Sequence, residues 1–523
     1  MEKAVASKSL GHCDSKESKL LVKVKKINRR ASPRLCWWIS VFSILFVILA
    51  CPGLDPLDGK YEALRHAAAF QSGGLASLDP CKGKRIFMYD LPPEFNVVVN
   101  DESRCNMSLI EWIDLCPRFS NDGYGAKLWS ENENEKDVSK QSAEIGHHDR
   151  NFDVFNWHDT DSYMLEKIFH IRMQKYRCLT TDPSQADAFF VPYYTGLLAL
   201  DLLYDQTDPE ITFEKRKNFG QELFDWLAEN GGEYWSRFGG RDHFMMKGRT
   251  GWDFEAHPIW GTGLSELPYA ANMTSLMLER RPIRPDRAHE IAIPYPTSFH
   301  PENPQTLQTW IKKVETSRRK FLFSYVGAPR DDTTSVRGII GNACITAGES
   351  VCNLVNCSVV KCSHDPVSIY KSFLGANFCL QPKGDTSTRR STFDCLISGA
   401  IPVFFATSSA YSQYFWHLPQ DRESYSVYIT EEDLRSGVSI QDILMAYSPQ
   451  RIRQMRKLIV SLIPNLIYNG YENDPSSPSK DAYEISLERV LKKIAGERKA
   501  LAEPTYKCWL PFKRSCLVAR SVS

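Results

Sequence analysis

Residues Lys371–Phe405 read KSFLGANFCLQPKGDTSTRRSTFDCLISGAIPVFF and combine strand, loop and helix signals in one short segment. Ala376–Leu380 is an apolar run of strand length, and Ile401–Phe405 is a second one. Pro382 and Gly384 mark a tight loop after the first run. The segment therefore predicts a β-α-β unit of a parallel sheet.

The helix of this unit is predicted from its apolar face and its ends. Asp385 or Thr386 can cap its first turn, Phe393 and Leu396 lie on one face, and Gly399 stands where a C-terminal cap belongs. A glycine-bearing loop that opens a helix is a common anion site. The loop therefore predicts a site for a diphosphate.

Charged side chains around the loop extend this prediction. Lys383, Arg389 and Arg390 supply positive charge, and Asp394 can accept hydrogen bonds from a ribose. The alternative is that Arg390 and Asp394 form an ordinary i,i+4 surface pair. The predicted donor-binding set is Lys383, Gly384, Asp385, Arg389, Arg390 and Asp394.

Composition and patterning bound the fold. The chain has 523 residues and a formal net charge of +1, which allows two to three domains and gives no support to nucleic-acid binding. Apolar strands alternate with amphipathic helices from Arg85 to Ile293, and the pattern restarts with the strand Lys320–Val326. We therefore expect two α/β halves joined by a linker, with a cleft between them.

The region before this α/β part has the features of a membrane anchor. Leu35–Cys51 is an apolar segment near the minimum length for a bilayer span, and several Lys and Arg residues precede it. Because positive charge stays cytoplasmic, the large C-terminal part is expected to be lumenal. A cleaved signal peptide is the alternative.

Cysteines and sequons agree with an oxidising compartment. Of 15 cysteines, 12 follow residue 51. A cluster of four lacks a close Cys-x-x-Cys pair, so we expect disulfides there rather than zinc. This cluster consists of Cys344, Cys352, Cys357 and Cys362, and the glycosylation sequons begin at Asn106, Asn272 and Asn356.

Several stretches in order along the chain resemble one family. They include RIFMYDLPPEFN (85–96), ADAFFVPYYTGLLALD (186–201), GRDHFMMKGRTGWDF (240–254), IPYPTSFHP (293–301), FLFSYVGAPR (321–330) and the 378–405 segment. The chain resembles the exostosin-type inverting glycosyltransferases of family GT47, in particular the plant xyloglucan galactosyltransferases. The resemblance implies two Rossmann-like domains of the GT-B type, a Golgi type II membrane protein, and a UDP-sugar donor with no essential metal or other cofactor.

The sequence and the resemblance together predict how the chain is divided and which partners it has. We expect a cytoplasmic tail (1–34), a signal-anchor (35–54), a stem (55–82), an acceptor-side domain (83–315), a nucleotide-sugar domain (316–470) and a C-terminal helix and tail (471–523). The expected partners are a UDP-sugar, a polysaccharide acceptor, the Golgi membrane and other glycosyltransferases in complexes. The implied reaction moves galactose from UDP-galactose to xylosyl side chains of xyloglucan. The alternatives are another UDP-sugar (galacturonic acid or arabinose) on a hemicellulose or pectin, and a non-catalytic lumenal lectin or scaffold.

An inverting transfer needs a general base, expected on the first domain across the cleft. Asp242 and His243, flanked by glycines, are the predicted catalytic pair; the alternative is that both are structural. Asp253 and Asp201 are lesser candidates. Asp159-Thr160-Asp161 has the form of a metal-binding DxD motif, but it directly precedes a strong helix, so we expect capping and no metal site.

Overall fold

A computed structural model of the chain describes residues 79–96, 116–128, 156–204, 214–216, 218–257, 260–281, 284–359, 362, 365–473 and 479–502. The chain divides into two compact units, Met1–Pro80 and Cys81–Ser523, and every named helix and strand belongs to the second. The predicted tail and anchor lie outside the described residues. Within them, no helix combines the length and the apolar character needed to cross a membrane.

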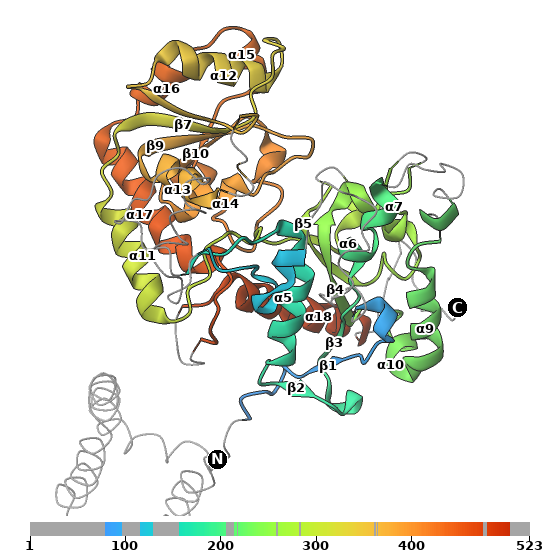
Figure 1. Ribbon diagram of the computed structural model, residues 1–523. Helices are drawn as coiled ribbons and strands as arrows, with labels where there is room; N and C mark the ends of the chain where they lie inside the picture. The colour runs from blue at the N-terminus through green and yellow to red at the C-terminus, as the bar shows by residue number, and fades with distance from the viewer. Residues whose placement is uncertain are drawn as a thin grey trace, which may run out of the picture. The chain divides into compact units, whose positions relative to one another are not determined.

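The first half of this unit, here called the first lobe, is built on a six-stranded sheet (Figure 1). All of its strand pairings are parallel. In spatial order the strands are β2 (Leu179–Thr180), β1 (Ile86–Met88), β3 (Ala188–Val191), β4 (His243–Thr250), β5 (Thr274–Glu279) and β6 (Glu290–Ala292).

Helices cover this sheet because their apolar faces pack on its buried side chains. Phe169 of α5 packs against Phe190 of β3, with ring centroids 5.8 Å apart. The helices of the first lobe are α5 (Leu165–Gln174), α6 (Thr195–Leu198), α7 (Leu200–Tyr204), α9 (Gln221–Asn230) and α10 (Gly232–Ser236).

The second lobe is built on a five-stranded sheet, again with parallel pairings only. Its strands are β11 (Val427–Tyr428), β10 (Ile401–Phe404), β9 (Ala376–Gln381), β7 (Phe321–Gly327) and β8 (Cys352–Asn356). Its helices are α11 (Pro304–Thr316), α12 (Val336–Ala347), α13 (Pro366–Leu374), α14 (Ser391–Ile397), α15 (Glu431–Arg435), α16 (Ile440–Met445) and α17 (Pro449–Leu466).

The predicted β-α-β unit is present as β9, α14 and β10. β9 and β10 pair in parallel, with Phe378 opposite Ile401. Gly399 has φ of +67° and ends the helix, as predicted. The helix, however, begins at Ser391 without a side-chain cap, so Asp385 and Thr386 lie in a loop and the predicted capping role was wrong.

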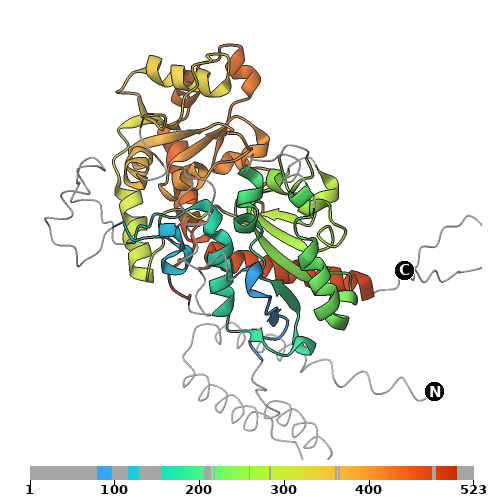
Figure 2. The same ribbon diagram turned by 45° about the vertical axis from the view of Figure 1, so that its right-hand side comes forward.

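The last helix, α18 (Ala482–Ala502), returns to the first lobe (Figure 2). Tyr483 packs on Phe169, with centroids 4.7 Å apart, and Arg172 of α5 forms a buried ion pair of 2.7 Å with Asp481. The C-terminal helix is therefore part of the first lobe's packing, and the predicted domain boundaries stay predictions.

Candidate functional site

A pocket of about 430 Å³ lies at the carboxyl end of the second lobe's sheet. Its lining includes Phe405, Thr407 and Ser408, which follow β10, and Tyr428, which ends β11. Lys383 follows β9 and also lines it. Parallel α/β sheets bind their ligands outside the carboxyl ends of their strands. This position is therefore the expected place for a ligand.

The predicted anion loop, residues 382–390, lies beside this pocket. At Gly384, a Cβ atom would lie 2.0 Å from Nη2 of Arg389, so the guanidinium packs directly on the glycine backbone and would have to shift if a side chain were added there. Lys383 Nζ is 2.8 Å from Glu431 Oε1. The structure thus brings together Lys383, Gly384 and Arg389 of the predicted set.

Three buried polar atoms at this edge have no hydrogen-bond partner within the described part of the chain. They are Nη2 of Arg389, the hydroxyl of Tyr325 and Nε2 of Gln381. Tyr325 and Gln381 lie in β7 and at the end of β9. Buried donors without partners are costly, and an anion's oxygens can satisfy them. A diphosphate supplies such oxygens.

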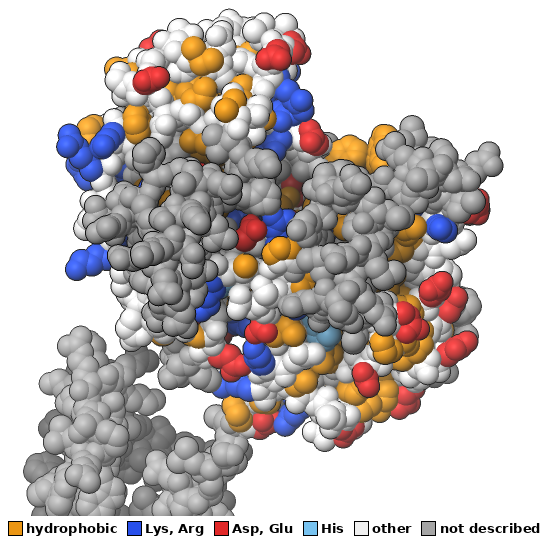
Figure 3. Space-filling model, viewed as in Figure 1, with side chains coloured by type: hydrophobic (Ala, Val, Ile, Leu, Met, Phe, Trp, Pro, Cys, Tyr) orange, Lys and Arg blue, Asp and Glu red, His pale blue; other side chains and the backbone are white. Residues whose placement is uncertain are grey.

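Asp385 lies at the exposed tip of the same loop. Its carboxylate is 3.4 Å from Arg337 and 3.9 Å from Arg330, and its side chain is 89 % exposed. Lys and Arg side chains are visible on the side of the second lobe that faces the first (Figure 3). The loop tip therefore carries a carboxylate among cations, so Asp385 has no evident role in binding an anion.

The contacts of Arg390 and Asp394 match neither the predicted diphosphate and ribose site nor an ordinary surface ion pair. Arg390 donates to the backbone carbonyl of Thr160 and to the hydroxyl of Ser298, both in the first lobe, and its Nε is 3.7 Å from Asp394. Asp394 is buried and accepts a hydrogen bond from Tyr370. Burial raises the pKa of Asp394, partly offset by Arg390. The pair is buried rather than a surface salt bridge, and Asp394 is not open to a ribose. Arg390 connects the lobes.

The sequence interpretation missed a second connection between the lobes. Glu279, the last residue of β5, accepts hydrogen bonds from Thr386 Oγ1 (2.8 Å) and Thr388 N (3.0 Å) of the 382–390 loop. It also accepts one of 2.6 Å from the Tyr295 hydroxyl. Burial raises the pKa of Glu279, and these hydrogen bonds oppose the shift. The available signal was a carboxylate ending the otherwise uncharged strand TSLMLE.

Further contacts hold this edge of the first lobe against the second. Gln413 Oε1 accepts from the Arg280 amide (2.9 Å), and Gln413 Nε2 donates to the Arg280 carbonyl (3.0 Å). The Tyr414 hydroxyl donates to the carbonyl of Leu278. The carboxyl end of β5 therefore contacts the second lobe through several hydrogen bonds.

The predicted catalytic pair lies at the other end of the first sheet. His243 begins β4 and is in register with Phe189, whereas Thr250, at the carboxyl end of β4, is in register with Glu279. At about 3.3 Å per residue, roughly 23 Å separates His243 from Thr250. Asp242 therefore lies far from the edge that meets the 382–390 loop.

The surroundings of this pair are those of a buried network. Asp242 accepts from Arg237 (2.8 Å) and faces His243 Nδ1 (2.9 Å), while the Tyr89 hydroxyl lies 2.9 Å from His243 Nε2. Neither Asp242 nor His243 is exposed. Burial alone would raise the pKa of Asp242, but bonds from His243 and Arg237 hold it below its usual range. The geometry favours the structural alternative over a base.

The other predicted acids have simple surroundings. Asp253 follows the carboxyl end of β4, is partly exposed and pairs with Arg249 at 2.9 Å. The side chain of Asp201 lies outside the description. Asp161 accepts from the Tyr163 amide, which confirms capping. Asp159 and Asp161 each lie 3.6 Å from Arg118, and no described group of three acids, histidines or cysteines could hold a metal.

The cysteine cluster forms disulfides, as predicted. Cys344 bonds Cys352, and Cys357 bonds Cys362. Two further disulfides join Cys81 to Cys178 and Cys379 to Cys395. The second of these joins β9 to α14 and so spans the 382–390 loop.

The glycosylation sites stay predictions. The Asn272 amide donates to the carbonyl of Gly239, and Oδ1 of Asn356 accepts from the Ser358 amide. Asn106 lies outside the described residues.

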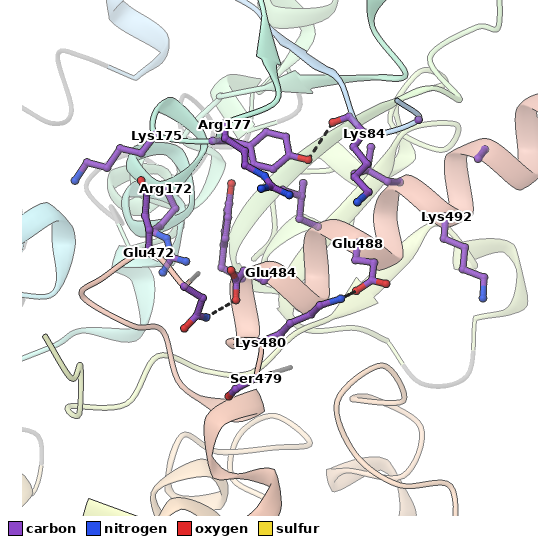
Figure 4. A pocket seen from close by; sticks show the side chains of 17 residues that line it. Lys84, Arg172, Lys175, Arg177, Glu472, Ser479, Lys480, Glu484, Glu488 and Lys492 are labelled. Carbon is purple, nitrogen blue, oxygen red and sulfur yellow. Dashed lines mark hydrogen bonds and ion pairs between the residues drawn. The ribbon is translucent and has the colours of Figure 1, made fainter. Parts of the chain in front are cut away.

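A second pocket, of about 460 Å³, lies between α5 and α18 (Figure 4). Basic and acidic side chains share its lining, and Lys480 pairs with Glu488 across one side. None of the predicted donor residues lines this pocket. It is therefore separate from the site at the carboxyl end of the second sheet.

With this geometry in place, comparison with known proteins gives the family. The model of the Exostosin GT47 domain matches residues 80–444. The chain belongs to the exostosin GT47 family. It is therefore a glycosyltransferase, as predicted, and the matched range contains both sheets and the 382–390 loop.

Two relatives from Arabidopsis thaliana show how similar the chain is to named members. One, "Probable xyloglucan galactosyltransferase GT12", is 39 % identical over 431 residues, which cover 81 % of this chain and 79 % of that protein. "Xyloglucan galactosyltransferase XLT2" is 36 % identical, covering 80 % and 76 %. A solved GtfA/B complex matches with a TM-score of 0.32 and 8 % identity over 64 % of this chain and 61 % of the solved one, too low to support an argument.

Proposed function

We propose that this glycosyltransferase transfers galactose from UDP-galactose to xylosyl side chains of xyloglucan, with inversion at the anomeric carbon. The names of its relatives support the substrate class. The observation that carries the donor site is the set of unpartnered buried donors at the second lobe's carboxyl edge, Arg389 Nη2, Tyr325 OH and Gln381 Nε2. In this proposal the two lobes are the Rossmann-like halves of a GT-B enzyme.

The residues at that edge suit the departure of UDP. Transfer breaks the bond between the anomeric carbon and the diphosphate, so negative charge grows on the leaving oxygens. Arg389 can donate to these oxygens, and Lys383, 2.8 Å from Glu431, can exchange that partner for phosphate. The acceptor hydroxyl loses its proton to a base on the first lobe. Asp253 is partly exposed at the edge of the first sheet that meets the 382–390 loop, so it is better placed for this than the buried Asp242.

The proposal includes no essential metal. Arg389 and Lys383 supply positive charge where many transferases use a cation. The carboxylates of the Asp159–Asp161 motif have other partners: Asp161 caps a helix, and both carboxylates face Arg118.

For localisation, we propose a Golgi type II membrane protein held by residues 35–54, which works beside other glycosyltransferases. The support is the basic tail and the apolar Leu35–Cys51 segment. In sealed vesicles, protease should remove only the tail. Digestion of the chain beyond Cys81 without detergent would contradict this orientation.

A donor panel tests the reaction. The full-length protein is incubated with xyloglucan stripped of galactose and with UDP-galactose, UDP-galacturonic acid or UDP-arabinose, and UDP release and the sugar product are measured. The proposal expects acceptor-dependent release with UDP-galactose and a β-galactosyl product. Preference for another donor would leave the proposed type of reaction in place and change the sugar that is transferred. No acceptor-dependent release with any donor would favour the lectin or scaffold alternative.

A further inference from the structure

Glu279 is the point where the first lobe meets the loop that is proposed to bind UDP. Its carboxylate accepts from the Thr386 hydroxyl with Oε1 and from the Thr388 amide with Oε2. Thr388 in turn donates through its own hydroxyl to the carbonyl of Ser409, next to the pocket residue Ser408. The loop is thus held on one side by its own lobe and on the other by Glu279.

The carboxylate of Glu279 accepts hydrogen bonds from neutral donors. No ion pair involves it among the described residues; the hydroxyls of Tyr295 and Thr386 and the Thr388 amide surround it. Hydrogen bonds to an ionised acceptor are stronger than those between neutral groups. Glu279 therefore restrains the loop more than a neutral residue of the same size would.

The same contacts place this carboxylate away from the reaction itself. Glu279 is 2 % exposed, and both of its oxygens are occupied by donors from the second lobe or from Tyr295. A general base needs an open path to the acceptor hydroxyl. The role that fits is control of loop shape.

We propose that Glu279 is a positioning residue: from the first lobe, it holds the 382–390 loop in the shape that presents Arg389 to the diphosphate of the donor. The inference rests on the proposed donor site. Because the carboxylate and the loop belong to different lobes, donor binding and the contact between the lobes are coupled. By reciprocity, UDP strengthens the contact that Glu279 makes.

Two substitutions at this position separate positioning from chemistry. Glu279→Gln keeps the length of the side chain, and its amide can accept from the Thr388 amide and donate to the rotatable hydroxyls of Thr386 and Tyr295. Glu279→Ala removes all of these bonds. Glu255→Ala is the matched control: Glu255 lies at the same edge of the first lobe, and its ion pairs, with Arg281 and Arg284, stay within that lobe.

The experiment measures UDP dissociation constants by calorimetry, and donor KM and kcat, for the full-length protein and each variant. Glu279→Ala should weaken UDP binding and raise donor KM about tenfold, the effect of losing one charge-assisted hydrogen bond. Glu279→Gln, which keeps the hydrogen bonds but loses their charge assistance, should weaken UDP binding less than Glu279→Ala does. Glu255→Ala should stay within about threefold of wild type. If Glu279→Ala does not fold, Thr386→Val, which removes one donor to this carboxylate, should show a smaller loss in the same direction.

Two results would overturn the inference. Unchanged UDP affinity in Glu279→Ala or in its substitute Thr386→Val would show that the contact does not shape the site. Loss of kcat in Glu279→Gln at unchanged UDP affinity would make the carboxylate a participant in the chemistry. A wild-type protein that binds UDP but transfers no galactose would refute the proposed reaction, and the UDP constants would still test Glu279.

Discussion

Arg390 in the second lobe donates a hydrogen bond to the backbone carbonyl of Thr160 in the first. The same side chain reaches Ser298 of the first lobe and lies 3.7 Å from the buried Asp394. One guanidinium therefore satisfies a carbonyl, a hydroxyl and a carboxylate from segments that are more than 90 residues apart in the chain. In this structure Arg390 therefore joins the lobes, and its predicted role in donor binding stays a prediction.

Arg390→Ala should therefore destabilise the protein. The change leaves Asp394 buried without its cation, which costs roughly 2 kcal/mol. Asp394→Asn should remove part of that cost, so the double variant should lose less than the sum of the single changes. Denaturant unfolding of the four proteins measures this coupling. Strict additivity would show that Arg390 and Asp394 do not stabilise each other. Loss of UDP affinity at full stability would return Arg390 to the donor site.

Asp242→Asn and His243→Ala test the structural interpretation of the predicted base. Both residues are buried at the amino end of β4 and are bonded to Arg237 and Tyr89. We expect each change to lower the melting temperature, while turnover per folded molecule stays within about threefold of wild type. If either variant loses the 10²–10⁴-fold in turnover that is typical of a missing base, at unchanged melting temperature and UDP affinity, the original prediction is correct.

Acid sensitivity should arise in part from His417, which is buried between the second lobe and α18. Its Nε2 lies 3.3 Å from the carbonyl of Ala482. Burial lowers the pKa of His417 from 6.5 to about 4. Between these values the unfolded chain binds a proton that the folded protein does not, so stability is lost as pH falls from 6.5 toward 4.

His417→Gln keeps an N–H donor for Ala482 but does not titrate. The variant should lose up to about 1.4 kcal/mol less than wild type for each pH unit below 6.5. Urea unfolding at pH 6.5, 5.5 and 4.5 measures the difference. Parallel pH profiles for the two proteins would contradict the assignment.

Activity should persist in excess EDTA, because Arg389 and Lys383 supply the positive charge and the Asp159–Asp161 motif faces Arg118. The measurement is UDP release before and after chelation. Complete loss of activity that manganese restores would revive the metal-binding interpretation of that motif.

The β-α-β unit could be predicted because its signals are local. Apolar runs of strand length determine local strands, and Gly399, with its positive φ, ends the helix, so the sheet formed as expected. The start of α14 was missed because Asp385 and Thr386 are good caps in isolation. In the folded chain, the hydroxyl of Thr386 donates instead to Glu279, which belongs to the first lobe.

The candidate site could be predicted only in part, for the same reason. Lys383, Gly384 and Arg389 are close in sequence and close in space. The partners of Arg390 are Thr160 and Ser298, whose proximity depends on how the lobes pack. The position of Asp242 and His243 at the amino end of β4, away from the 382–390 loop, could not be predicted, because a glycine-flanked motif does not show which edge of a sheet faces the partner lobe. Their catalytic role stays a prediction.

In the proposed enzyme, the carboxyl edge of the second sheet binds the UDP part of the donor through Arg389. The measurement is a UDP titration of the wild type, of Arg389→Ala and of Arg435→Ala. Arg435 is the control because it is exposed on the same lobe and its ion pair with Glu431 is long at 3.8 Å. We predict that Arg389→Ala binds UDP about ten- to a hundredfold more weakly at unchanged melting temperature, and that Arg435→Ala binds it normally. Equal UDP affinity in all three proteins would contradict it.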